Sequence, residues 1–367
     1  MRKNTFLANI NMREVILHIT IIMLLATTVG KVNCQAQMTL ITSKEQVRIN
    51  LAGRGKVNIC WGDGQRSKYE LPSKFNDRNA HVHTYSDTTV RTITIIGNGI
   101  TIIDCAGNQL TYLNVSKNKA LKALYCQTNQ LASLDISKNT ALQKLECGKN
   151  QLKMLVIDKN TALEELSCAD NQLTDLEISN AVALKQLSCW NNQLTSLHVN
   201  RNKELEFLYC SKNQLINLDV SNNIKLGVLS CGDNQIMDLD ISKNIKLWSL
   251  RCDGNHFKHL DVSNNTRLRD LDCKSNQLTN LDVSINTELL NLCCANNQLM
   301  SLDVSKNRSL WTLHCYNNNF SENALNMLFE TLRDWTDITS AEITIYGNHG
   351  SDYCDRSIAE RKGWKVK

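Results

Sequence analysis

Proline and aromatic residues are scarce in this chain of 367 residues. Pro72 is the single proline, and Phe, Trp and Tyr together make up 5% of the sequence. Apolar residues nevertheless reach 42%, so the chain can bury a sizeable core and is not intrinsically disordered. Few aromatics and almost no proline fit neither an ordinary enzyme core nor a proline-rich linker protein. The composition instead favours a regular array.

Strong charge of one sign and the common enzyme motifs are also lacking. The formal net charge is +5, and residues 1–36 carry three of these charges, so the remainder is nearly neutral and lacks the electrostatic footprint of a nucleic-acid-binding protein. The chain has no P-loop, no G-x-S-x-G, no H-E-x-x-H and no dinucleotide glycine motif. We therefore expect no enzyme activity, no catalytic residue, no metal site and no cofactor.

An apolar run long enough to span a membrane is missing, although a shorter one lies near the amino terminus. Residues 15–29 are mostly apolar and follow a basic start, as in a secretory signal peptide. Small residues at Cys34 and Ala36 predict cleavage after residue 36, which leaves a secreted or surface-exposed chain without a membrane span. Lipoprotein attachment at Cys34 is the alternative, and Lys31 and Asn33 disfavour it because a lipobox has an apolar and a small residue there.

From residue 100 onward an internal repeat dominates the sequence. Cysteine recurs every 21 residues, and an asparagine follows each of these cysteines after three positions, from Asn108 to Asn318. Ten complete units span residues 100–309, and an eleventh breaks off near Phe320. The cysteines of this column are Cys105, Cys126, Cys147, Cys168, Cys189, Cys210, Cys231, Cys252, Cys273, Cys294 and Cys315.

The unit at residues 121–141 shows the whole pattern, L-x-x-L-x-C-x-x-N-Q-L-x-x-L-D-I-S-x-N-x-x. Leu124 and Cys126 alternate around Tyr125, which predicts a short strand with two side chains turned inward and one outward. Stacked units place these strands in parallel register. Because one unit is too short for a strand, two turns and a full helix, we expect extended or 3₁₀ segments on the opposite side, with Leu134 and Ile136 completing the core.

This pattern resembles the leucine-rich repeat family, whose signature is L-x-x-L-x-L-x-x-N-x-L, and more narrowly the bacterial 21-residue IRREKO class. The resemblance implies a β-dominated α/β fold, a right-handed solenoid with a parallel concave sheet and an extended or 3₁₀ convex side. It also implies an internalin-like function, in which the concave face recognises a macromolecule.

The cysteine column invites a metal or redox interpretation, but its position argues for packing. The cysteines occupy the site where related repeats carry leucine, and in-register strands hold neighbouring Cβ atoms about 4.8 Å apart, beyond the usual disulfide range. No C-x-x-C pair or histidine set supplies zinc ligands. We therefore expect buried free thiols that act as small hydrophobic side chains. Cys60, Cys293 and Cys354 lie outside the column, and Cys293 takes an outward position.

Two polar columns also have structural interpretations. Each asparagine of the repeat lies where the chain turns, and its amide is expected to bond backbone groups of its own unit and of the neighbouring one. A column of aspartates lies in Leu-Asp-Val/Ile-Ser turns, where a carboxylate accepts from nearby backbone N–H groups; calcium bridging between units is the alternative. These aspartates are Asp135, Asp219, Asp240, Asp261, Asp282 and Asp303.

The two ends of the array are expected to be caps, because a solenoid exposes its core there. Residues 37–99 contain alternating apolar runs and predict a small β module. Its Trp61-Gly62-Asp63-Gly64 and His83-Thr84-Tyr85 segments resemble the W-G-D-G and H-x-Y signature of PKD-like domains. Residues 321–367 predict a carboxy-terminal α/β cap with a helix after Ser321, a strand over 341–346 and a short helix over 356–362. The solenoid itself is assigned to residues 100–320.

Recognition is the natural use of such an array, because its outward positions vary while its inward ones do not. We expect a bacterial binding protein with a protein ligand; a carbohydrate ligand and a role as an adaptor between two proteins are the alternatives. Large side chains gather at outward positions in three groups, and exposed aromatics of this kind mark interaction sites. The groups are Trp190, Phe207 and Tyr209; Trp248 and Arg269, close enough for a cation–π contact; and Leu290, Trp311, His314 and Tyr316.

Overall fold

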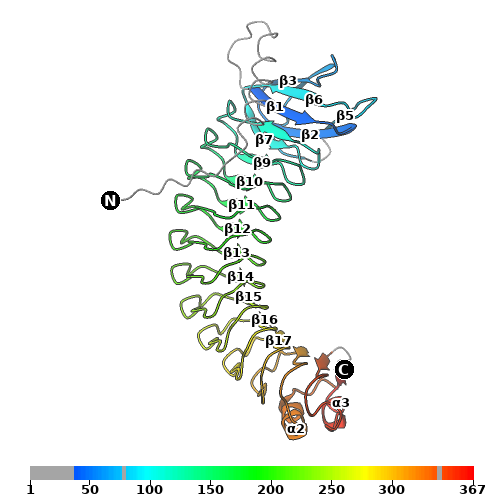
Figure 1. Cartoon of the computed structure of the whole chain (residues 1–367), viewed down its shortest axis with the longest axis vertical. Coiled ribbons are helices and arrows are strands. Elements are labelled where there is room, and N and C mark those ends of the chain that lie inside the picture. Colours follow the sequence, from blue (N-terminus) through cyan, green and yellow to red (C-terminus); the bar gives the residue numbers. More distant parts are fainter. Residues whose placement is uncertain (1–36, 77–79, 337–340) are drawn as a thin grey trace, which may run out of the picture.

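The computed structural model describes residues 37–76, 80–336 and 341–367. They form an elongated, curved solenoid with a small β module at its amino-terminal end and two short helices at the other (Figure 1). The expected signal peptide, including Cys34 and Ala36, lies outside the described residues. Within the described ranges, no helix is long and apolar enough to cross a membrane.

Eleven short strands, one from each repeat unit, stack into a parallel sheet. Equivalent residues face each other along the whole sheet, so Leu187 lies opposite Leu208, which lies opposite Leu229. The strands are β7 (Ile100–Asp104), β9 (Ala123–Tyr125), β10 (Lys144–Glu146), β11 (Glu165–Ser167), β12 (Gln186–Ser188), β13 (Phe207–Tyr209), β14 (Val228–Ser230), β15 (Ser249–Arg251), β16 (Asp270–Asp272), β17 (Asn291–Cys293) and β18 (Thr312–His314). This register confirms the leucine-rich repeat solenoid expected from the 21-residue period.

The convex side of the solenoid consists of extended segments and turns, as the length of the unit predicts. In the unit of residues 121–141, Leu134 and Ile136 are buried and complete the core. A second inward asparagine closes the turn: the Asn139 side-chain amide donates to the carbonyls of Val115 and Asn118 in the preceding unit, at 3.0 and 2.7 Å. This second ladder also ties each unit to its predecessor.

The cysteine column lies inside the solenoid. All eleven of its thiols are buried and unbridged, among the inward leucines of the strands. Desolvation by burial raises the pKa of these thiols, to about 12 for Cys168 and Cys315, because the thiolate would lose its hydration. Packing rather than thiol chemistry therefore describes the column. Outside the column, the described residues include Cys60, Cys293 and Cys354, and all three are half-buried.

The amino-terminal module consists of two antiparallel sheets that both continue into the repeats (Figure 1). One sheet has the order β4-β3-β6-β1-β8, so a strand of the first repeat unit closes it. In the other, β2 pairs with β5 and with β7, and β7 begins the parallel concave sheet. The strands are β1 (Gln37–Thr42), β2 (Gln46–Gly53), β3 (Lys56–Cys60), β4 (Arg66–Glu70), β5 (His81–Thr84), β6 (Arg91–Ile96) and β8 (Tyr112–Asn114).

The two motifs of this module meet in space. Trp61 is buried, its indole donates to the Ser67 hydroxyl at 2.8 Å, and the Tyr85 hydroxyl donates to the Trp61 carbonyl at 2.6 Å. The His83 ring stacks on Trp61, and its Nε2 lies 2.7 Å from an Asp63 carboxylate oxygen. The W-G-D-G and H-x-Y residues thus act as one structural cluster that joins two strand ends.

The carboxy-terminal cap covers the last repeat with α2 (Glu322–Thr331), α3 (Ser357–Glu360) and two more parallel strands, β19 (Ala341–Thr344) and β20 (Trp364–Val366). Helix α2 begins at Ser321, whose hydroxyl accepts from the Ala324 N–H at 3.2 Å. Its buried face presents Leu325, Leu328 and Phe329 to the open end of the core. Sequence patterns predicted both helices and β19, but not β20.

Candidate functional site

Each repeat unit presents its variable side chains to the concave face and its edge at five positions. Counted from the first leucine of the unit, these are the second, third, fifth, seventh and eighth residues; in the unit that starts at Leu205 they are Glu206, Phe207, Tyr209, Ser211 and Lys212. Because the units stack in register, equivalent residues form five columns. The chemistry of any site on this face therefore depends on which side chains are neighbours within and between columns.

The first asparagine ladder holds the edge of this face in place. The Asn192 amide nitrogen donates to the carbonyls of Cys168 and Cys189, both at 3.1 Å, and its oxygen accepts from the Leu173 N–H at 3.0 Å. Each ladder residue thus satisfies three backbone groups in two units. The expected structural role of these asparagines is confirmed.

The eighth position adopts a left-handed backbone conformation that turns its side chain outward. The φ angle is 54° at Asn191, 56° at Lys212 and 51° at Asp233, a region that non-glycine residues rarely occupy. Hydrogen bonds to the next unit hold this conformation, for example from the Lys212 N–H to the Gly232 carbonyl at 2.9 Å. The array therefore displays a polar or charged side chain here in most units.

The first group of sequence-predicted residues does meet in space. Trp190 and Tyr209 line the same hollow of about 290 Å³ on the concave face. Phe207 is half-buried on β13, on the same side of the sheet as Tyr209, but does not line the hollow. Sequence reasoning missed the rest of the lining, which is Ser211, Lys212, Ser230, Gly232, Asp233, Arg251 and Asp253.

The cation–π contact expected between Trp248 and Arg269 is wrong. Arg269 instead forms an ion pair with Glu288 at 3.2 Å, on the side away from Trp248. The indole of Trp248 lies over the preceding unit, where a Cβ on Gly227 would be 2.9 Å from its ring nitrogen. Because Gly227 has no side chain, the Trp248 indole can pack against it in the preceding unit, although 43% of this tryptophan remains exposed.

The third group is partly covered by the carboxy-terminal cap. Tyr316 stacks on Tyr346 with ring centroids 4.6 Å apart, and the His314 ring is 2.6 Å from the Thr344 hydroxyl. These two side chains therefore help to attach the cap to the last repeat. Trp311 is 45% exposed and remains available, whereas Leu290 is half-buried.

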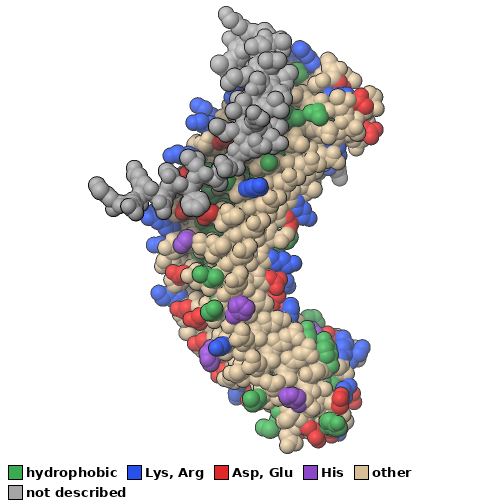
Figure 2. All heavy atoms as spheres, in the orientation of Figure 1, with side chains coloured by type: hydrophobic (Ala, Val, Ile, Leu, Met, Phe, Trp, Pro, Cys, Tyr) green, Lys and Arg blue, Asp and Glu red, His purple; other side chains and the backbone are tan. Residues whose placement is uncertain are grey.

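Charges of both signs are interspersed along the solenoid (Figure 2). On the concave face, Lys144 bridges Glu146 and Glu165 at 3.0 and 2.7 Å. Farther along, Lys274 lies 2.8 Å from Asp272 and 3.6 Å from Asp253. Desolvation and the nearby Asp272 raise the pKa of the Asp253 carboxyl, and Lys274 lowers it in part. The face thus combines local ion pairs with low net charge.

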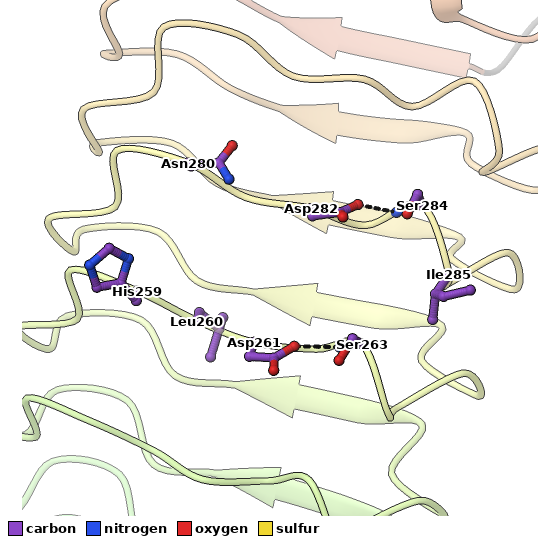
Figure 3. A pocket seen from close by; sticks show the side chains of 8 residues that line it. All are labelled: His259, Leu260, Asp261, Ser263, Asn280, Asp282, Ser284 and Ile285. Carbon is purple, nitrogen blue, oxygen red and sulfur yellow. Dashed lines mark hydrogen bonds between the residues drawn. The ribbon is translucent and has the colours of Figure 1, made fainter.

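The aspartate column lies on the extended segments and turns that follow each strand, and not on the concave sheet. The Asp261 and Asp282 carboxylates accept from the backbone N–H groups of Ser263 and Ser284, each at 2.9 Å (dashed lines in Figure 3). These four residues line a hollow of about 260 Å³. Asp135, Asp219, Asp240 and Asp303 make the same contact in their own turns. The turn-capping role predicted from the sequence is confirmed. Among the described residues, no group of three or more His, Cys, Asp or Glu side chains is arranged to hold a metal.

We predict that this column contributes to acid sensitivity. The backbone N–H and then the hydroxyl of the following serine lower the pKa of Asp261 and Asp282 below its ordinary value of about 3.9. Because the folded-state pKa is depressed, the stabilisation is present above pH of about 4 and is lost as pH falls through the lower folded-state pKa. Melting temperatures at pH 6 and pH 3 should therefore differ less in the Asp261→Asn/Asp282→Asn variant than in the parent. An equal acid shift in both would contradict the capping role.

The fold defined by these contacts is that of a leucine-rich repeat protein. Solved structures similar to this chain include the functional domain of InlJ from Listeria monocytogenes, described as including a cysteine ladder. It is 31% identical, with a TM-score of 0.64 over 76% of this chain and 62% of the InlJ chain. This chain thus spans less than two thirds of that relative.

Two further structures show the same fold at lower identity. The internalin InlF from Listeria monocytogenes is 20% identical, with a TM-score of 0.59 over 72% of this chain and 86% of its own. YopM from Yersinia pestis is 25% identical, with a TM-score of 0.55 over 69% of this chain and 68% of its own. No protein-family model and no curated protein sequence matches the chain.

Proposed function

We propose that this chain is a secreted or surface-exposed bacterial module that recognises a protein through the concave face of its solenoid. The observation that carries the proposal is that Trp190 and Tyr209 line one hollow of the concave face together with the charged side chains of Lys212 and Arg251. The similarity to InlJ supports an interaction module built from leucine-rich repeats. Secretion is proposed from the apolar run at residues 15–29.

The division of the chain follows the same proposal. Residues 37–99 form an amino-terminal cap derived from a PKD-like module, residues 100–320 form the binding solenoid, and residues 321–367 form the second cap. The cluster of Trp61, Asp63, His83 and Tyr85 supports the PKD-like assignment because it unites both motif segments. The merging of its sheets with the first repeat supports the role as a cap.

A binding experiment with matched variants tests the concave face. The protein is screened by biolayer interferometry against purified host extracellular proteins and bacterial envelope proteins. For a partner that binds, Trp190→Ala and Tyr209→Ala are expected to weaken affinity by ~1–3 kcal/mol each, with little change in melting temperature, because both side chains are half-exposed.

The matched control is Ile224→Ala, which removes an exposed side chain (56% exposed) from the turn that precedes β14 and does not line the hollow. It is expected to leave affinity unchanged. The proposal is rejected if Ile224→Ala weakens binding as much as Trp190→Ala does, or if the concave variants lose stability while keeping full affinity.

A further inference from the structure

The hollow beside Trp190 exists because small residues interrupt two columns of the concave face. Parallel strands are about 4.8 Å apart, so three steps separate Trp190 from Asp253 by roughly 14 Å. The seventh-position column between them holds only Ser211 and Gly232. In the fifth-position column, Ser230 alone separates Tyr209 from Arg251. One end of the trough is therefore aromatic and the other end is charged.

The floor of this hollow is polar and tightly organised. The hydroxyls of Ser211 and Ser230 are hydrogen-bonded to each other at 2.8 Å. Asp253 leans over Gly232, where an added Cβ would lie 2.4 Å from a carboxylate oxygen. Asp233 leans in the same way over Gly254, with a distance of 2.5 Å. Because these glycines have no side chains, both carboxylates can lie close to the backbone at the bottom of the hollow.

Several polar groups that line the hollow have no partner in the described part of the chain. The Trp190 indole N–H and the Tyr209 hydroxyl make no hydrogen bond there, and Asp233 has no ion pair or side-chain hydrogen bond. Lys212 and Arg251 likewise have no ion-pair partner among the described residues. Donors and acceptors are therefore both available, next to an aromatic surface.

The balance of charge decides which ligand fits. Lys212 and Arg251 would repel a cation, and Asp233 and Asp253 would repel an anion, although Lys274 at 3.6 Å offsets part of the Asp253 charge. A ligand of either sign therefore meets at least one unfavourable side chain. A neutral ligand rich in hydroxyl groups can use all four, because carboxylates accept and the basic groups donate. The apolar face of such a ligand needs an aromatic neighbour, which Trp190 and Tyr209 supply.

We propose that the hollow between Trp190 and Asp253 is a subsite for one unit of a neutral saccharide. The sugar ring packs on Trp190 and Tyr209, its hydroxyls donate to Asp233 and Asp253, and Arg251 donates to a ring or hydroxyl oxygen. The volume of about 290 Å³ is just below the usual range for ligand pockets and suits a single sugar unit. This site does not require the protein partner proposed above.

The test uses saturation-transfer NMR and calorimetry with the whole protein. The probes are neutral oligosaccharides of glucose, galactose, mannose and N-acetylglucosamine, together with sialylated, sulfated and cationic chitosan oligomers as charged counterparts. We expect at least one neutral probe to bind with a dissociation constant of about 1 mM or tighter, and no charged probe to bind better. Trp190→Ala and Asp233→Asn should each weaken that binding about tenfold.

Tyr353→Ala is the matched control, since it removes an exposed aromatic ring in the carboxy-terminal cap (75% exposed) and should leave sugar binding unchanged. Ser211→Leu should abolish binding by filling the floor. The proposal is overturned if no neutral probe binds, if only charged probes bind, or if Trp190→Ala has no effect. Because the protein screen is read separately, loss of the sugar site leaves recognition of a protein by the same face intact, and the two failures are distinguishable.

Discussion

Replacing Asn213 by alanine is expected to destabilise the protein by at least ~1–3 kcal/mol, the penalty for one buried polar group left without a partner. The Asn213 amide bonds the carbonyls of Cys189 and Cys210 at 3.1 and 3.0 Å, and its oxygen accepts from the Leu194 N–H at 3.0 Å. All three hydrogen bonds are buried, so water cannot replace the lost partner. The measurement is the midpoint of urea unfolding, which should fall clearly below that of the parent.

Two companion variants make this result specific. Gln214→Ala changes the next, exposed residue and keeps the hydrogen bond from its backbone N–H to the Leu194 carbonyl at 2.8 Å, so the unfolding midpoint should hardly move. Asn213→Asp keeps an acceptor and loses the amide donor, so it should also destabilise the fold. Equal midpoints for Asn213→Ala and Gln214→Ala would show that the ladder contributes little.

Thiol labelling is expected to divide the cysteines into two sharply different sets. The eleven thiols of the column should react only after unfolding, about 10³-fold or more slowly than an exposed thiol, because they are buried and a stable fold rarely opens. Cys60, Cys293 and Cys354 are half-buried and should react first. Among these, Cys293 should be slow at pH 8, since desolvation and the nearby Asp272 raise its pKa to about 11 and leave little thiolate.

Mass spectrometry of protein labelled with iodoacetamide, before and after denaturation in urea, measures this division. Full labelling after denaturation is the internal control that all thiols are free. Disulfides between successive repeats, or folded-state labelling of Cys189 or Cys210 as fast as that of Cys60, would contradict packing as the role of the column.

The solenoid could be predicted from the sequence because its inward residues have almost no freedom. Counterparts of Cys210 and Asn213 recur in every unit, and Leu208 recurs in all but the first, which has Ile103. Each must fill the same space or bond the same backbone groups as its counterpart one repeat earlier. The same constraint made the turn-capping aspartates predictable. A 21-residue period therefore specifies strand, register and the side chains that point inward.

The site was only partly predictable because outward side chains follow no such constraint. Large residues such as Trp190 and Tyr209 could be found by their position in the repeat. The side chains around them depend on small neighbours. Gly232 leaves space for Asp253, and Gly227 leaves space for the Trp248 indole on the side away from Arg269. A search of each outward column for glycine and serine would have located the whole hollow, whereas the list of aromatic residues gave only Trp190 and Tyr209 of its lining.

The junctions with the caps escaped prediction for a related reason. Strand β20 is three residues long, and its pairing with β19 depends on a fold-back of the chain through α3 that has no periodic signal. The continuity of β2 with β7 likewise joins segments about 50 residues apart by backbone hydrogen bonds, which leave little trace in side-chain type.

The in-register pairing of the strands has a mechanical consequence. Hydrogen bonds such as that from the Cys210 N–H to the Ser230 carbonyl, at 2.8 Å, run from one unit to the next and hence along the curved axis. A force that pulls the two caps apart acts on every interface between units in series, because each unit contacts only its neighbours, and the weakest interface opens first. A tether attached at both ends would therefore lengthen in steps of one repeat, and the protein would retain most of its folded units while it yields.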